Sequence, residues 1–221
     1  PGRGRASGRP DASRHRGPAL MPLSGLSVVI PNFNGRSFVS RAIESAVREA
    51  DEVIVVDDGS TDGSAGWLRE TFPGVRVVEC VRNRGFAAAC NLGARAAAGE
   101  ILYFLNSDAE LLPGALGAVR PVFDDPAVFA VATMEERGWW PIGELKGGRM
   151  SVRYVRAPLP RRTPVLFASG GHAAFRREMF LDLGGCDEGY APFYWEDIDL
   201  CWRAWRRGWT GALEPAGRAR H

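Results

Sequence analysis

Strand and helix patterns alternate strictly over residues 26–133, and this feature restricts the fold of the chain more than any other. Aliphatic and β-branched runs predict strands, and the segments between them have helical periodicity. The predicted strands cover residues 26–31, 52–57, 75–80, 101–105 and 128–133, and the predicted helices cover 37–47, 64–71, 86–98 and a segment opened by Pro113. Such alternation predicts an α/β fold with a mainly parallel sheet flanked by helices.

The second part of the chain is less regular. Residues 134–164 contain two tryptophans and several glycines and prolines, and we expect a long irregular excursion there. A strand over 165–175, a short helix over 177–183 and a helix over 196–207 follow. We expect one domain over residues 23–221, with a nucleotide-binding half (23–133) and an acceptor and catalytic half (134–221). Because the chain stops abruptly at His221, we also expect a truncation at the C-terminus.

Composition excludes several classes of protein. The net charge is +2, and residues 1–22 carry five arginines against one aspartate, so the remainder is slightly acidic. This distribution argues against nucleic-acid binding.

We expect residues 1–22 to form a disordered basic tail, with Met21 as an alternative natural start. No apolar run is long enough to span a bilayer, although the tail could touch an anionic membrane peripherally. Four scattered cysteines without a C-x-x-C pair fit a reducing, cytoplasmic location, with the inner face of the membrane as an alternative.

Polar and small residues follow four of the predicted strands. In open α/β sheets, ligands bind beyond the carboxyl ends of the strands, so these residues predict a binding rim. The candidates are Pro31, Phe33 and Asn34 after the first strand, Asp57 and Asp58 after the second, Asn83 and Gly85 after the third, and Asn106 and Asp108 after the fourth.

The rim is acidic rather than a glycine-rich phosphate cradle. Neither a Gly-x-Gly-x-x-Gly nor a Gly-Lys-Ser/Thr motif is present. An acidic rim binds phosphate through a divalent cation, for which Asp108 is the natural ligand. A simple turn aspartate is the alternative for Asp108, and helix capping is the alternative for Asp57 and Asp58. Asp57 could otherwise accept an N–H group of a nucleobase.

Three acids open the last predicted helix, directly after an aromatic stretch at 190–195. A helix dipole favours acids at this position, which is the simpler interpretation of Glu196, Asp197 and Asp199. Three acids beside several aromatic residues, however, suggest a pocket that stacks a sugar and holds a base. The direction of any pKa shift at Asp197 stays open, because the dipole lowers it and burial raises it. His172 has no partner pattern and is interpreted as structural.

Five stretches in order resemble glycosyltransferase family 2, the large inverting group with the Rossmann-like A-type glycosyltransferase fold. The last of them is similar to the rhamnosyltransferase-like branch of the family. They are residues 28–35 (VVIPNFNG), 55–64 (VVDDGSTDGS), 83–93 (NRGFAAACNLG), 105–108 (LNSD) and 195–203 (WEDIDLCWR).

The resemblance implies a role for each part of the rim. Pro31, Phe33 and Asp57 would hold the base and ribose of a nucleotide-sugar donor, with Asn34, Asp58, Asn83, Gly85 and Asn106 in the same donor site. Asp108 and His221 would bind Mn²⁺ or Mg²⁺ on the diphosphate. Asp197 would be the catalytic base, with Trp195, Glu196 and Asp199 on the acceptor side.

The implied activity is inverting sugar transfer to a glycan or lipid-linked acceptor, in the synthesis of cell-surface polysaccharide such as cell wall. Asn106 replaces the first acid of the family's Asp-x-Asp motif, which removes one charge from the metal site. A nucleotide-sugar-binding module without catalysis is therefore the alternative. A nucleotidyltransferase would need a basic, glycine-rich loop after the first strand. Residues 31–35 do not form such a loop, which argues against this class of enzyme.

Overall fold

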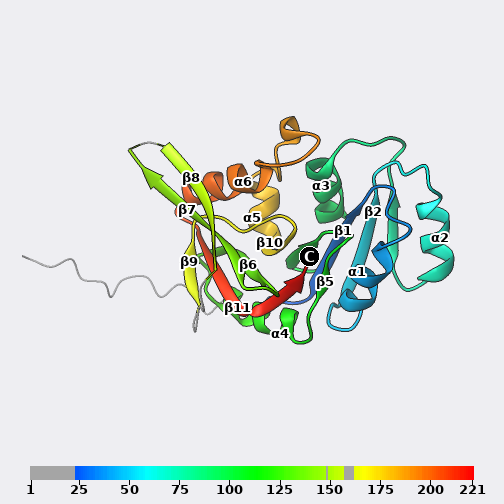
Figure 1. Ribbon diagram of the computed structural model, residues 1–221, viewed down its shortest axis with the longest axis horizontal. Coiled ribbons are helices and arrows are strands. Elements are labelled where there is room, and N and C mark those ends of the chain that lie inside the picture. The colour runs from blue at the N-terminus through cyan, green and yellow to red at the C-terminus, as the bar shows by residue number, and fades with distance from the viewer. Residues whose placement is uncertain (1–22, 148, 157–161) are drawn as a thin grey trace, which may run out of the picture.

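A mixed sheet of nine strands forms the centre of the molecule (Figure 1), in a computed structural model that describes residues 23–147, 149–156 and 162–221. The strand order is β3-β2-β1-β4-β10-β6-β11-β5, and β9 pairs with β11. The strands are β1 (Leu26–Asn32), β2 (Glu52–Asp57), β3 (Arg76–Glu79), β4 (Ile101–Leu105), β5 (Glu110–Leu111), β6 (Val128–Glu135), β9 (Thr163–Val165), β10 (His172–Arg176) and β11 (Thr210–Arg220). The predicted tail over 1–22 lies outside the described residues.

Helices cover both faces of the sheet. Helices α1, α2 and α4 contribute to one buried apolar cluster, and α3, α5 and α6 contribute to the other. Their bounds are α1 (Val39–Ala46), α2 (Ser64–Thr71), α3 (Phe86–Ala96), α4 (Ala115–Val119), α5 (Arg177–Asp182) and α6 (Glu196–Trp205), with short 3₁₀ segments η1 (Arg120–Asp124) and η2 (Glu188–Tyr190).

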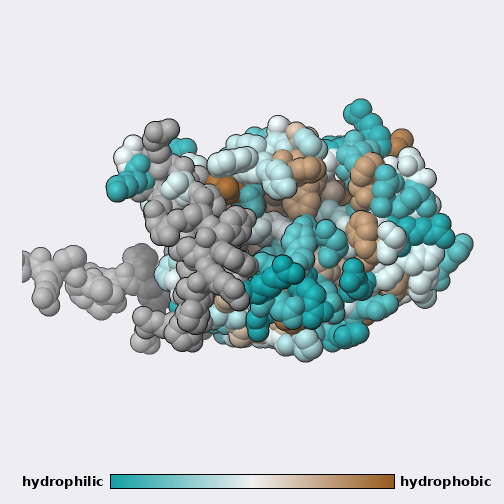
Figure 2. All heavy atoms as spheres, viewed as in Figure 1, coloured by the Kyte–Doolittle hydropathy of each residue, from teal (hydrophilic) through white to brown (hydrophobic). Residues whose placement is uncertain are grey.

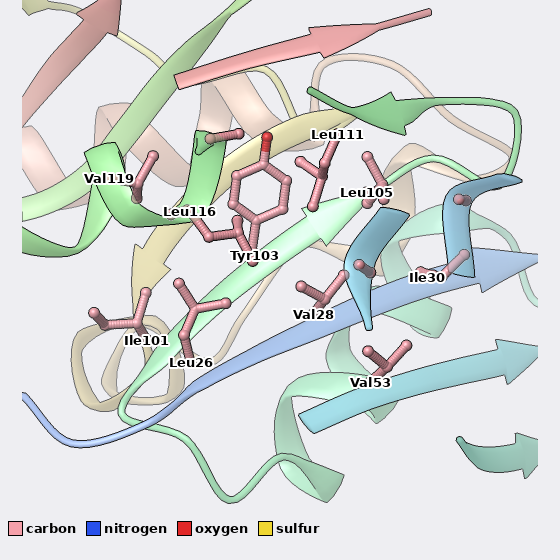
Figure 3. Close-up of a cluster of buried hydrophobic side chains, with 14 of the residues drawn as sticks. Leu26, Val28, Ile30, Val53, Ile101, Tyr103, Leu105, Leu111, Leu116 and Val119 are labelled. Carbon is pink, nitrogen blue, oxygen red and sulfur yellow. The ribbon is translucent and has the colours of Figure 1, made fainter. Parts of the chain in front are cut away.

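Strand β1 shows why the sheet is sandwiched in this way. Val28 and Ile30 belong to the cluster under α1, whereas Val29 belongs to the cluster under α3. Because neighbouring side chains of a strand point to opposite faces, a continuous apolar run requires cover on both sides. Figure 3 shows one such cluster, in which Tyr103 of β4 packs among aliphatic side chains from β1, β2 and α4. Burial of each large side chain contributes about 1.5–3 kcal/mol.

The α/β alternation predicted for residues 26–133 is confirmed, and β1 to β4 pair in parallel. The rest of the sheet is mixed, because β10 runs antiparallel between β4 and β6. Two further strands, β5 and β11, have no counterpart in the sequence prediction. The prediction of a single strand over residues 165–175 is wrong, because β9 ends at Val165 and a separate strand, β10, begins at His172.

The prediction of an irregular excursion over 134–164 is also wrong. Strand β6 continues to Glu135, and the strands β7 (Trp139–Lys146) and β8 (Arg149–Arg156) pair as an antiparallel hairpin. The glycines and prolines suggested a loop, but edge strands tolerate both residues, and this ribbon is a separate two-stranded sheet (Figure 1). Residues 157–161 lie outside the described part of the chain.

Strand ends determine where a ligand can bind. Figure 1 places the chain's last residue near the middle of the face shown, where β11 runs beside β5. The carboxyl ends of β1, β2 and β4 open on the same side of the sheet, as parallel pairing requires. Among the described residues, no helix combines the length and hydropathy needed to cross a membrane.

Candidate active site

Two adjoining pockets lie at the carboxyl ends of the strands. The strand-end pocket, of about 480 Å³, is lined by the loops that follow β1, β2, β3 and β4. The α6 pocket, of about 470 Å³, is lined by the start of α6, the segment before β10 and the end of β11. They share a wall, so together they form one cleft. The shared residues are Phe86, Asn106, Asp108 and Phe193.

The strand-end pocket contains most of the predicted donor residues. Phe33 is 47% exposed, which leaves an aromatic ring free at the end of β1. The predicted residues that line the pocket are Pro31, Phe33, Asp58, Asn83, Gly85, Asn106 and Asp108. Four loops far apart in sequence therefore meet in one pocket, as the strand-end argument predicts.

Asp58 organises one wall of this pocket. Its carboxylate accepts backbone N–H groups of Arg84, at 3.0 and 2.9 Å, and of Gly85, at 2.8 Å. These bonds clamp the loop after β3 against the loop after β2. Gly85 has φ +91°, and a Cβ at this position would approach the carbonyl oxygen of Pro192 to 3.0 Å. A glycine is needed where the two loops and the aromatic stretch come together.

Asp57 and Asn34 line neither pocket. Asp57 is buried behind the strand-end pocket, where it accepts the Asn32 amide at 2.9 Å and the Ser60 backbone N–H at 3.0 Å. Asn34 accepts the Thr61 backbone N–H at 2.8 Å and so ties the loops after β1 and β2 together. The predicted contacts of both residues with a donor stay predictions.

Asp197 lies in the α6 pocket with its two oxygens in different environments. One oxygen accepts the backbone N–H of Ile198 at 2.8 Å, and the other accepts that of Gly170 at 3.1 Å. Burial raises the pKa of Asp197, and these hydrogen bonds only partly offset it. The direction that the sequence left open is therefore upward, toward the range useful for a base near neutral pH.

Glu196 is the more constrained of the two adjacent acids. It is 5% exposed and lines the α6 pocket, yet its Oε2 has no hydrogen-bond partner among the described residues. Burial, followed by the neighbouring Asp197, raises the pKa of Glu196. A buried oxygen without a hydrogen-bond partner is costly, so Oε2 of Glu196 is a candidate contact for a ligand.

The predicted cation ligands Asp108 and His221 lie next to each other. Oδ1 of Asp108 and Nε2 of His221 are 3.2 Å apart, and both side chains are exposed in the cleft. Asn106 Nδ2 lies 3.4 Å from the same imidazole nitrogen. No group of three or more ligating side chains occurs among the described residues. The pair fits a divalent cation that takes its remaining ligands from phosphate oxygens and water, as Mg²⁺ and Mn²⁺ sites often do.

The aromatic stretch reaches the mouth of the cleft. Phe193 and Tyr194 are 54% and 72% exposed, and their rings meet edge to face at 4.8 Å. Phe193 and Tyr194 line the α6 pocket, whereas the predicted acceptor-side residues Trp195 and Asp199 line neither pocket. Asp199 instead pairs with Arg203 at 2.7 Å. Figure 2 shows hydrophobic surface on this face between the regions that α6 and α3 occupy in Figure 1.

Sequence reasoning missed several residues of the α6 pocket. His172, interpreted as structural, lines it, as do Phe86 and Glu135. The pair Gly170 and Gly171 was a usable signal, because a Cβ on Gly171 would lie 2.9 Å from the Asn106 amide. Such close approach of backbone to a polar side chain is a reason for glycine beside a site.

The fold is the A-type glycosyltransferase fold, which solved structures share. The structure of GalNAc-T7 with UDP, GalNAc and Mn²⁺ matches with a TM-score of 0.75 at 21% identity, over 90% of this chain and 44% of that one. The mannosyltransferase PcManGT from Pyrobaculum calidifontis, in complex with GDP-Man and Mn²⁺, matches with a TM-score of 0.67 at 24% identity, over 89% and 56%.

Residues 27–184 match the profile of Glycosyl transferase family 2, and the chain belongs to this family. N-acetylgalactosaminyltransferase 6 of Drosophila melanogaster is 30% identical over 90% of this chain and 34% of its own length. The N-acetylglucosaminyl-diphospho-decaprenol L-rhamnosyltransferase of Mycobacterium tuberculosis is 29% identical over 76% of this chain and 66% of its own length. The chain spans 34% to 38% of the first three curated relatives it matches.

Proposed function

We propose that this chain is an inverting, metal-dependent glycosyltransferase that moves a sugar from a nucleotide-diphosphate sugar to an acceptor hydroxyl. One observation carries the proposal. Asp197 and the pair formed by Asp108 and His221 line the same pocket, although they are far apart in sequence. That pocket shares a wall with the strand-end pocket, so a donor spanning both would place its diphosphate near the pair.

The donor's base and ribose belong in the strand-end pocket. Pro31 and the exposed ring of Phe33 offer an apolar surface for a flat base. Asn83 and Gly85 form the opposite loop, which Asp58 holds in place. In this proposal Asp57 acts from behind the pocket, by fixing the Asn32 amide at the end of β1.

Asp108 and His221 hold the cation. A bound divalent cation would neutralise the negative charge that develops on the leaving diphosphate. The mixed carboxylate and imidazole donors favour Mn²⁺, and Mg²⁺ is the alternative. Both solved structures described above contain Mn²⁺.

Asp197 supplies the base. Its carboxylate takes the proton of the acceptor hydroxyl, whose oxygen then attacks the anomeric carbon opposite the bond to the diphosphate. Attack from that side inverts the configuration. The bonds from Gly170 and Ile198 orient the carboxylate, and its raised pKa makes it a stronger base than an exposed aspartate. Holding both substrates in line supplies the entropic part of the rate.

The acceptor is proposed to be a glycan or a lipid-linked sugar in cell-surface polysaccharide synthesis. The relative whose name specifies a diphospho-decaprenol acceptor and L-rhamnosyl transfer supports a lipid-linked acceptor and a rhamnosyl-type donor. We place this reaction in the cytoplasm, at the inner face of the membrane, where such an acceptor would be reached peripherally.

A nucleotide-sugar-binding module without catalysis is the second candidate. Asn106 favours it, because an amide stands where the motif's first carboxylate would add charge to the cation site. Both candidates predict donor binding, but only the glycosyltransferase predicts turnover.

Replacing Asp197 with Asn tests the proposal. We expect turnover to fall by about 10²- to 10⁴-fold, as for loss of a general base. Donor affinity should change little, because Asp197 does not line the strand-end pocket. Release of nucleoside diphosphate would be measured with UDP-, GDP- and dTDP-linked sugars in Mn²⁺, Mg²⁺ or a chelator, and donor binding by calorimetry.

Asp182→Asn is the matched control, since this carboxylate is exposed on α5 and lines neither pocket. Normal turnover by Asp197→Asn would show that the assigned base is wrong. Donor binding by the wild-type chain without turnover in either metal would favour the binding module.

A further inference from the structure

His172 lines the α6 pocket, and the proposed reaction gives it no role. It begins β10, where it pairs with Leu105 at the end of β4, and its side chain lines the pocket. The ring lies 6.4 Å from that of His221, between ring centroids.

A buried hydrogen-bond chain determines which imidazole nitrogen carries the proton. The Thr133 hydroxyl donates to the carbonyl oxygen of His172 at 2.6 Å. Its single proton is then used, so its oxygen must accept from the Tyr103 hydroxyl and from Nδ1 of His172, both at 3.0 Å. Nδ1 therefore carries the hydrogen, and a neutral ring leaves Nε2 with a free lone pair.

The other ring nitrogen, Nε2, stays available to a ligand. None of the hydrogen bonds among the described residues engages Nε2. With Nδ1 turned toward Thr133, Nε2 is the nitrogen left for the pocket.

The remaining polar groups of the α6 pocket are also mainly hydrogen-bond acceptors. Besides Tyr194, its ionisable side chains are four carboxylic acids and two histidines, and no lysine or arginine lines it. The unpaired Oε2 of buried Glu196 is a further acceptor. Phe193 and Tyr194 add aromatic surface, and Tyr194 is held there in the left-handed region at φ +80°. Acceptors beside aromatic rings suit a ligand that presents hydroxyl protons and a flat C–H face.

We propose that the α6 pocket selects a neutral sugar ring of the acceptor, and that Nε2 of His172 accepts a hydrogen bond from one of its hydroxyls. This inference rests on the proposed function, whose acceptor it specifies. With Asp108 assigned to the cation, an anionic sugar would still meet the carboxyl groups of Glu135, Glu196 and Asp197, and no lysine or arginine lines the pocket to pair with it. His172 is thus a specificity-determining residue, distinct from the base Asp197 and from the cation pair.

Saturation-transfer NMR on the full chain tests the inference without requiring turnover. The probes are methyl glycosides of glucose, galactose and mannose and the matched methyl uronides, each with UDP or GDP and Mg²⁺. We expect the neutral glycosides to bind at least about tenfold more tightly than the uronides. His172→Leu should weaken the neutral glycosides about fivefold to tenfold, as for one lost hydrogen bond. His172→Gln, which places an amide oxygen near the position of Nε2, should stay within threefold of wild type.

Several results would overturn the inference: equal or tighter binding of the uronides, unchanged glycoside affinity in His172→Leu, or a matching loss of nucleotide affinity in that variant. The inference would also be overturned if none of the neutral glycosides bound to the wild-type chain. The neutral and anionic comparison needs no variant, so it remains decisive if His172→Leu does not fold. Glycoside binding without sugar transfer would count against the proposed function alone.

Discussion

At the residue scale, the adjacent acids Asp57–Asp58 and Glu196–Asp197 differ in how the protein satisfies their carboxyl groups. Asp58 accepts three backbone N–H contacts from Arg84 and Gly85, so its charge is compensated by the protein. Glu196 is equally enclosed, but its Oε2 has no partner among the described residues. Asp58 therefore holds a loop, whereas Glu196 keeps an unpaired carboxyl oxygen beside a cavity. Strain and unpaired groups of this kind are typical of functional sites.

Replacing Glu196 with Gln should stabilise the fold near neutral pH. The pKa of Glu196 is higher in the folded protein than in the unfolded chain. The protonated side chain therefore contributes fully to stability below the pKa of the unfolded state. This stability is lost as the pH rises through the pKa of the folded state. Glutamine removes that loss. A gain of about 1 kcal/mol would raise the melting temperature by about 2–4 °C for a chain of this length.

Thermal unfolding of both proteins at pH 7 and near pH 4 is the measurement. The difference should shrink at the lower pH, because Glu196 is then protonated to a larger extent in both states. A constant difference across this range would show that charge burial is not its cause.

At the element scale, α3 connects the core to both pockets. Its N-terminal end begins at Phe86, whose backbone N–H donates to the Pro192 carbonyl at 3.0 Å and so anchors the aromatic stretch. Its middle lies so close to the sheet that a Cβ on Gly93 would be 2.2 Å from Cγ1 of Val29. The position of the donor loop thus depends on a glycine in the helix interior.

Gly93→Ala should therefore destabilise the chain despite the higher helix propensity of alanine. The added methyl group overpacks the contact with β1, at a cost of about 1–3 kcal/mol. Gly66→Ala in α2 is the matched control, because nothing lies within 4 Å of its added Cβ. The control should gain up to about 1 kcal/mol from helix propensity. Urea unfolding of the two variants should shift in opposite directions, and a shared direction would contradict the packing argument.

At the scale of the whole molecule, the sheet joins the two predicted halves. Strand β10, from the second half, lies between β4 and β6, and the apolar clusters on both faces draw on both halves. The acid Asp197 and the donor loops are positioned by this shared sheet. Neither half has a complete set of strand partners alone.

We therefore expect one cooperative unfolding transition. Far-ultraviolet circular dichroism reports secondary structure, and tryptophan fluorescence reports mainly the second half, which holds six of the seven tryptophans. The two signals should give the same urea midpoint within error. Two separated midpoints would show that the halves unfold independently.

Local pattern was sufficient for the parallel half of the fold and for the residues at its strand ends. A continuous apolar run such as 26–31 predicts a strand that is buried on both faces, and polar residues directly after it are expected at the carboxyl end of that strand. The roles of Asp108 and Asp197 came from the resemblance to family motifs and stay predictions. The pairing of β10 between β4 and β6, the tautomer of His172 and the raised pKa of Asp197 had no local signal. Each depends on atoms brought together from distant parts of the chain, and burial and hydrogen-bond partners exist only once those parts have packed.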